Sequence, residues 1–202
     1  MSKRIGNGKK TSFTTLAIEV VSIVLGVMLA LAANEWRENR QIERLKATSL
    51  QSIRQEIETN LALLSKAHEH HTATLAMLRE ALENEAEMTP EKAEVVVGRL
   101  HKRGGIYQMP SVLDTAWESA KTAQVLSYFD YEQLLVLANV YKVQRSYNEF
   151  TRSIIQTINL VHFMDTDAVR YLNGTQGSLN EVWYSDRRLM NAYEEALEAL
   201  AE

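Results

Sequence analysis

Cysteine is absent from the 202 residues of this chain, and only two prolines interrupt it. The lack of cysteine excludes disulfides, thiolate zinc sites, iron–sulfur clusters and a cysteine nucleophile. The 22 lysines and arginines do not outnumber the 26 aspartates and glutamates, so no basic excess indicates nucleic acid binding. The period-two alternation of apolar residues that is typical of strands is also missing, and the chain is therefore predicted to be all-α.

The usual sequence marks of catalysis are missing as well. The glycines lack the spacing of a phosphate-binding loop, and the histidines of His68-Glu69-His70-His71 are not four residues apart, as in the zinc-binding helix of metalloproteases. No pattern places a nucleophile beside a base. We therefore expect a non-enzymatic protein with no catalytic residue, no cofactor and no metal.

One long apolar run is present, over residues 13–33, and its sequence is FTTLAIEVVSIVLGVMLALAA. About 20 mostly apolar residues are needed for a helix to cross a bilayer, so this run predicts a transmembrane helix and a lipid environment. A cleaved signal peptide is the alternative, because Ala30-Leu31-Ala32 has the small-x-small pattern of a cleavage site. The length of the run and the ionisable Glu19 inside it favour a retained anchor.

The orientation of this anchor depends on the basic residues at its two ends. The tail of residues 1–12 carries only positive charge, whereas the other flank mixes arginines with glutamates. A short basic tail is hard to translocate, so we expect it in the cytoplasm and the C-terminal domain in the periplasm, on a bacterial inner membrane. Trp36 and Arg37 follow the run where an interfacial anchor is expected.

Small residues share one face of the predicted transmembrane helix. In lipid, such residues let helix backbones approach closely, so this face is expected to pack against another helix. Glu19 lies on the same face, either as a buried carboxyl that meets a partner or solvated among headgroups; a proton or ion pathway is a third alternative. The packing face consists of Glu19, Ser22, Gly26, Ala30 and Ala33.

Residues 34–84 are predicted to form a long amphipathic helical stalk, because no proline or glycine lies between Gly26 and Pro90. Its apolar spacing alternates four and three, which is a coiled-coil heptad pattern. His68 and His71 fall within this pattern, and His70 points away from it. The two histidines form a polar layer that sets register, part of a metal site or a pH sensor. The stalk seam consists of Ile57, Leu61, Leu64, His68, His71, Leu75, Leu78 and Leu82.

Residues 89–202 are predicted to form an antiparallel helical bundle that packs on the stalk. Thr89 caps a helix from Pro90 to Lys102, and Ser111 with Asp114 caps a second helix. A third, long helix begins after Asp130 and is expected to pair with the stalk.

The rest of the bundle is predicted from its glycines and its large aromatic residues. A short helix from Asp165 to Asn173, a loop over Thr175–Tyr184 and a last helix capped by Ser185 are expected to follow the long one. Trp117 and Tyr141 are expected in the core of the bundle.

Three segments carry a family resemblance. They are an anchor that reads IVLGVMLALA over residues 23–32 with Asn34-Glu35-Trp36 after it, Thr115-Ala116-Trp117-Glu118, and a tyrosine-rich helix around Tyr141. In these segments the chain resembles a large family of uncharacterised single-pass bacterial membrane proteins. Ala123 stands where the family pattern has a glycine, so we expect a continuing helix in place of a turn. The resemblance implies topology and fold class and no known activity.

These observations predict a membrane scaffold or accessory subunit that acts through helix–helix association, as a homo-oligomer or docked on a larger membrane complex. The alternative is a membrane-anchored sensor whose bundle binds a small ligand and passes a shift along the stalk. The tail of residues 1–12 is too short for an output domain, so a sensor would need a second protein.

Overall fold

The computed structural model of the chain describes residues 13–83, 88–162 and 168–201. These residues form helices and no strand, which confirms the predicted all-α fold with an apolar N-terminal helix. The predicted cytoplasmic tail, residues 1–12, lies outside the described residues. In chain order the elements are α1 (Phe13–Leu82), α2 (Pro90–Lys102), α3 (Thr115–Thr122), the 3-10 helix η2 (Val125–Tyr128), α4 (Tyr131–His162) and α5 (Ala168–Ala199).

The chain divides into two compact units, Met1–Leu45 and Lys46–Glu202. The first unit contains the beginning of α1 with the apolar run. The second unit contains the rest of α1 together with α2, α3, η2, α4 and α5.

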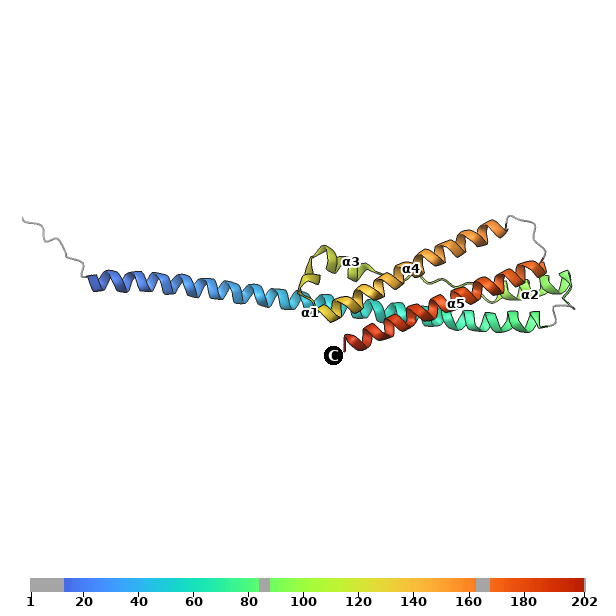
Figure 1. The fold of residues 1–202 in the computed structure, drawn as a ribbon, viewed down its shortest axis with the longest axis horizontal. Coiled ribbons are helices and arrows are strands. Elements are labelled where there is room, and N and C mark those ends of the chain that lie inside the picture. Colours follow the sequence, from blue (N-terminus) through green and yellow to red (C-terminus); the bar gives the residue numbers. More distant parts are fainter. Residues whose placement is uncertain (1–12, 84–87, 163–167, 202) are drawn as a thin grey trace, which may run out of the picture. The chain divides into compact units, whose positions relative to one another are not determined.

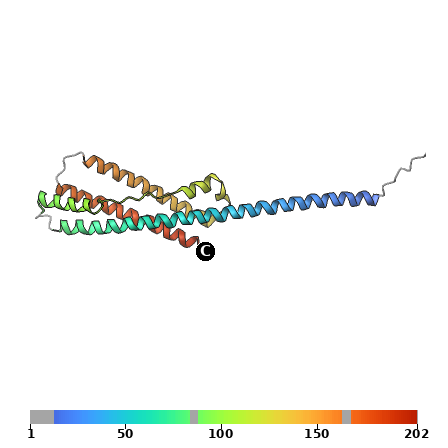
Figure 2. The ribbon, with the colours of Figure 1, turned by 180° about the vertical axis from the view of Figure 1, so that it is seen from behind.

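Within the second unit, α4 and α5 form the closest helix pair, and α2 lies along α5 (Figures 1 and 2). The part of α1 in this unit runs antiparallel to α5, as shown by the hydrogen bonds His71–Asp186 and Arg79–Asn180. The stalk was expected to pair with the helix after Asp130, and these hydrogen bonds show that it also pairs with α5. The long helix that pairs most closely with α4 is α5, for which the sequence predicts shorter pieces.

The predicted break in the last part of the chain is wrong. Residues Thr175–Tyr184 are helical and belong to a continuous α5 of 32 residues, Ala168–Ala199. Its described buried side chains Leu172, Leu179 and Val182 recur at helical spacing and pack in one hydrophobic cluster. This packing outweighs the low helix propensity of Gly174 and Gly177, since tertiary burial overrides local propensity.

The expected continuation of the helix through Ala123 is also wrong. The helix α3 ends at Thr122, and Gln124 adopts φ 56°, the left-handed conformation, before η2 begins. A left-handed residue at the end of a helix turns the chain away from the helix axis. The turn is therefore present without a glycine, and an exposed glutamine adopts the unfavourable angle.

Two hydrophobic clusters form the core of the second unit. One contains Ile53, Ile57, Leu64, Trp117, Tyr141 and Leu189 among its members, and the other contains Leu75, Leu78, Leu100, Leu172, Leu179 and Val182. Along α1 and α5, a fully buried polar pair, His71 and Asp186, falls between the apolar residues of the two clusters. A polar layer therefore divides the core.

Residues 103–114 form neither helix nor strand, and polar side chains of α1 hold their backbone. Asn60 donates from Nδ2 to the carbonyl of Leu113 at 2.7 Å and accepts from its N–H at 2.8 Å. His70 Nε2 lies 2.9 Å from the carbonyl of Gly105, and His71 accepts from the N–H of Gln108 at 2.9 Å. Because buried backbone groups need partners, these side chains allow an irregular segment to pack against the helices.

We predict that Gly174→Ala and Gly177→Ala each stabilise the protein. Both glycines lie inside α5, and an added Cβ would meet nothing within 4 Å. Alanine in a helix interior is favoured over glycine by about 0.5–1 kcal/mol. The free energy of unfolding is to be measured by chemical denaturation of the full chain in detergent, followed by circular dichroism.

The contrasting variant is Gly105→Ala, which should destabilise because Gly105 has φ +90°. Loss of stability in the Gly174 and Gly177 variants would contradict a continuous α5.

Candidate functional site

By its length and composition, the apolar run of α1 is able to cross a membrane. None of its most apolar stretch is buried inside the structure. Large side chains such as Ile18, Leu29 and Leu31 are more than half exposed. An exposed apolar surface of this extent marks an interaction with lipid or protein.

The predicted packing face lies within this run, and all five of its residues, Glu19, Ser22, Gly26, Ala30 and Ala33, are exposed. No other side chain or backbone approaches within 4 Å of a Cβ placed on Gly26. The face is therefore open along its length. Trp36 and Arg37, the predicted interfacial anchor, are also exposed.

The eight residues of the stalk seam face the interior of the second unit. Ile57, Leu64, His71, Leu75 and Leu78 are buried, and Leu61, His68 and Leu82 are half-buried. The seam is one part of a wider buried face of α1 that also includes Ile53, Glu56, Asn60, Ala67 and Thr74.

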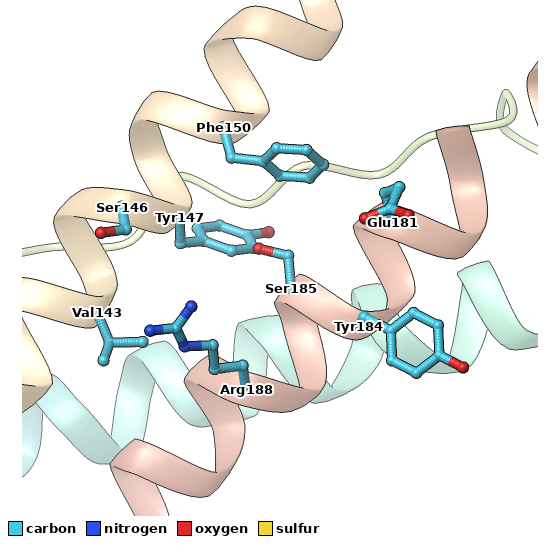
Figure 3. Close-up of a pocket in the computed structure, with 8 residues that line it drawn as sticks. All are labelled: Val143, Ser146, Tyr147, Phe150, Glu181, Tyr184, Ser185 and Arg188. Carbon is cyan, nitrogen blue, oxygen red and sulfur yellow. The ribbon is translucent and has the colours of Figure 1, made fainter. Parts of the chain in front are cut away.

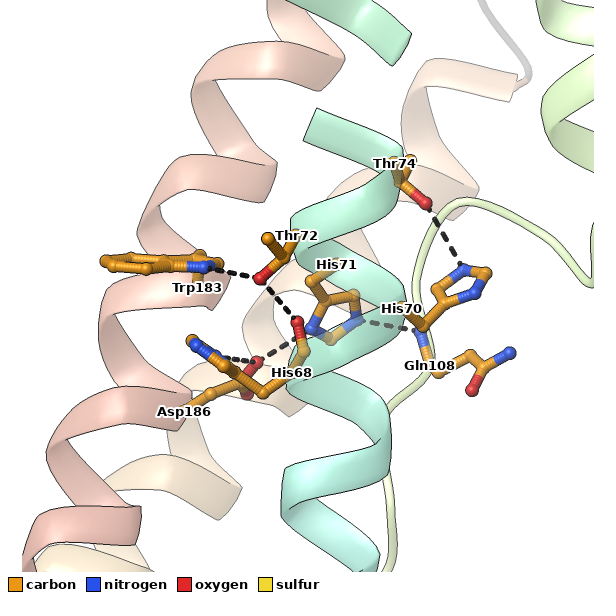
Figure 4. A network of polar contacts seen from close by, with 8 residues as sticks. All are labelled: His68, His70, His71, Thr72, Thr74, Gln108, Trp183 and Asp186. Atoms are coloured by element: carbon orange, nitrogen blue, oxygen red, sulfur yellow. Dashed lines mark hydrogen bonds and ion pairs between the residues drawn. The ribbon is translucent and has the colours of Figure 1, made fainter. Parts of the chain in front are cut away.

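The polar layer centres on His71 and Asp186, whose side chains are both fully buried (Figure 4). His71 Nδ1 lies 2.7 Å from Asp186 Oδ2, and His71 Nε2 lies 2.9 Å from the backbone N–H of Gln108. Because a backbone N–H can only donate, Nε2 must be an acceptor, and the ring proton sits on Nδ1. His71 is thus a neutral imidazole that donates to a carboxylate.

Further side chains of α1, α4 and α5 surround Asp186. His68 Nδ1 lies 3.6 Å from Asp186 Oδ2, beyond hydrogen-bond distance, and the His68 ring contacts that of Trp183 with centroids 4.9 Å apart. Trp183 Nε1 donates to the hydroxyl of Thr72 at 2.9 Å. Desolvation by burial raises the pKa of Tyr147 above its usual range, and the charge of Asp186 adds to this effect. The tyrosine is therefore a neutral neighbour of the carboxylate.

His71 is not placed to act as a base toward a bound substrate. A catalytic base needs a ring nitrogen that can reach a substrate, whereas both nitrogens of His71 are engaged and the ring is fully buried. In the described part of the chain, no three histidine, cysteine, aspartate or glutamate side chains are arranged to hold a metal ion. His70, which was expected to point away from the seam, is half-buried with its Nε2 against the carbonyl of Gly105.

A second polar network lies in the other half of the core, around Glu56. Glu56 Oε2 accepts from the N–H of Ala116 at 2.7 Å, and Glu56 Oε1 accepts from the hydroxyl of Tyr141 at 2.8 Å. A carboxylate suits the positive end of a helix. The N-cap residue Asp114 makes no side-chain cap bond, so the expected Ser111 and Asp114 cap is replaced by Glu56 of α1.

The predicted core aromatics meet in this half. Trp117 and Tyr141 are buried, and their rings stack with centroids 4.8 Å apart and an interplanar angle of 12°. Desolvation by burial, followed by the hydrogen bond to Glu56, raises the pKa of Tyr141. The tryptophan is a core residue.

A groove of about 370 Å³ lies between α4 and α5, lined by Val143, Ser146, Tyr147, Phe150, Glu181, Tyr184, Ser185 and Arg188 (Figure 3). Aromatic rings of Tyr147 and Phe150 form one wall, and α5 supplies the opposite wall. Its two charged residues, Glu181 and Arg188, are exposed. Its one buried polar group is the hydroxyl of Tyr147, which is fewer than the several convergent polar groups of a selective ligand site.

No protein family model matches the chain, and no curated protein or solved structure is significantly similar to it.

Several residues that organise the second unit were not predicted from the sequence, notably Glu56, Asn60, Gln144 and Asp186. Gln144 Nε2 donates to the carbonyl of Leu113 at 2.8 Å, and its Oε1 accepts from Tyr193 at 2.7 Å. The helical spacing of Glu56 and Asn60 from the seam could have identified them as part of the buried face. The heptad pattern assigns polar residues to their positions. Asp186 fell at the predicted start of the last helix, where no buried partner was expected, and was therefore overlooked.

We predict that His71→Leu destabilises the protein more than Asp186→Asn does. The first change leaves a buried carboxylate without its donor, which costs about 3–5 kcal/mol. The second removes the charge and keeps an acceptor for His71, so a loss of about 1 kcal/mol is expected. Chemical denaturation of the full chain in detergent measures both values.

The matched control is His101→Leu, because His101 is exposed and should tolerate the same change. An equal or larger loss in Asp186→Asn would contradict a neutral His71 that donates to a carboxylate.

We also predict that stability falls at alkaline pH. Burial raises the pKa of Tyr107 to about 12 and raises that of Tyr141 and Tyr193 as well. An unfolded tyrosine ionises near pH 10, so the neutral folded form contributes stability that is complete below about pH 10 and lost as the pH rises through the folded pKa. Denaturation between pH 7 and pH 11.5 measures this loss.

Tyr141→Phe should reduce the slope with which the free energy of unfolding falls at alkaline pH. The reduction is up to about 1.4 kcal/mol per pH unit, the value for one proton. Tyr131→Phe is the control, since Tyr131 is 73% exposed and should leave the slope unchanged. Equal slopes for all three proteins would refute the assignment to Tyr141.

Proposed function

We propose that this chain is a non-enzymatic, single-pass membrane protein that acts as a scaffold or accessory subunit through helix–helix association. The observation that carries the proposal is the apolar run of α1, none of which is buried in the structure. In water, each exposed square ångström of apolar surface costs about 25 cal/mol, so a run of this length requires a cover of lipid or protein. A bilayer supplies that cover along a span of about 20 residues.

The location follows from the charges that flank the run. Residues 1–12 carry Lys3, Arg4, Lys9 and Lys10 with no acidic residue, which favours the cytoplasmic side of a bacterial inner membrane. The second unit then occupies the periplasm. The absence of cysteine suits either compartment.

The association surface is the packing face of the span. Small side chains bring helix backbones close together in lipid, where van der Waals packing replaces the hydrophobic effect as the driving force. Gly26 is open, with Ser22 and Ala30 one turn to either side, and Glu19 adds a polar group on the same face. The partner is a second copy of this chain or a helix of a larger membrane complex.

The geometry of the second unit supports this proposal over a ligand sensor. The buried polar groups His71, Asn60 and Glu56 are engaged with the protein's own backbone and side chains. The groove between α4 and α5 has exposed charges and a single buried polar group, the hydroxyl of Tyr147. The domain is thus better suited to present a stable surface to a partner than to bind a small ligand in a selective pocket.

We predict that Gly26→Ile weakens association of the span. A branched side chain at the centre of the packing face keeps the backbones apart, and a loss of at least about tenfold in dimer signal is expected. The measurement is a membrane-dimerisation assay in which the span drives a reporter, repeated as crosslinking of the full chain in membranes.

The matched control is Ala17→Ile, which places the same side chain on the opposite face at about 100° per residue. An unchanged dimer signal in both variants would contradict association through the packing face. If only a mixed complex forms in the membrane, mass spectrometry of the crosslinked material identifies the foreign helix.

A further inference from the structure

We infer that Trp36, Arg37 and Arg40 form a binding site for the phosphate of an anionic lipid headgroup, in the leaflet that faces the second unit's compartment. The inference rests on the proposed membrane anchoring and adds a lipid class to it. All three residues belong to α1 within the first unit, Met1–Leu45.

Charge is segregated around α1 just after the apolar run. At about 100° per residue, Trp36, Arg37, Arg40 and Arg44 fall within an arc of about 100°. Glu35 and Glu38 lie outside this arc, and Glu43 borders it beside the Trp36 edge. One side of the helix therefore presents a tryptophan ring and three guanidinium groups.

No described residue neutralises the arginines of this arc. The described salt bridges join other residues, and Arg37 and Arg44 make no ion pair with any described residue. Arg40 contacts the ring of Trp36, with its Cζ 4.8 Å from the ring centroid. These cations are free to bind an external anion, and arginine suits phosphate because its fork of N–H groups can bind two oxygens.

The Arg40 contact also shows the direction of the side chain. Side chains on a helix lean toward its N-terminus, and Arg40 reaches back over the ring one turn earlier. The indole thus holds the guanidinium on the side of the apolar run. Arg37 and Arg40 begin about 6 and 10 Å beyond Ala33, and a backward lean brings both groups to the depth of lipid phosphates.

The test uses the full chain in nanodiscs of equal phosphatidylcholine and phosphatidylglycerol. Native mass spectrometry measures which lipid the protein retains as the disc is stripped away. The natural sequence should retain phosphatidylglycerol preferentially. Arg37→Gln/Arg40→Gln should reduce that preference at least roughly fivefold, which is the effect of one cation near the membrane surface.

The control with the same loss of charge is Arg145→Gln/Arg152→Gln, at two exposed positions of α4, and it should retain the preference. An equal reduction in this control, or no preference in the natural sequence, would overturn the lipid site. Flotation with vesicles of phosphatidylcholine alone tests the anchor separately. Failure to float overturns anchoring, whereas flotation without a lipid preference overturns only this inference.

Discussion

The second unit depends on polar side chains of α1 that hydrogen-bond the backbone of the non-helical segment before α3. Asn60 binds both backbone groups of Leu113, His71 accepts from Gln108, and Glu56 accepts from Ala116 at the start of α3. Without these partners the segment would bury unpaired N–H and C=O groups, which is costly. One face of α1 thereby supplies the hydrogen-bond partners of a segment that has no regular secondary structure.

The same face also sets the register between α1 and α5. An apolar seam alone tolerates sliding by a heptad, because one leucine replaces another at similar cost. The buried pair of His71 and Asp186 removes that freedom, since any shift would leave a carboxylate and an imidazole among aliphatic side chains. The division of the core into two hydrophobic clusters follows from this requirement for a polar layer.

Local signals made part of this structure predictable. The heptad spacing identified a buried face of α1, and Thr89 with Pro90 marked the beginning of α2, where Thr89 accepts from the N–H of Lys92. The continuity of α5 was not predictable in this way. Its two glycines are a local signal for a break, whereas the burial of Leu172 and Leu179 that keeps the helix continuous depends on residues far away in the sequence. The cap that Glu56 provides to α3 was equally hidden, since 60 residues separate the two partners.

The position of the unit boundary inside α1 has a consequence for how the protein can be divided. Leu45 and Lys46 are consecutive residues of one unbroken helix, so no linker or loop separates the apolar run from the folded domain. Proteases and domain insertions favour exposed loops. Separation of the domain from the apolar run would therefore require a cut within helical backbone, so the run is a direct continuation of the folded domain.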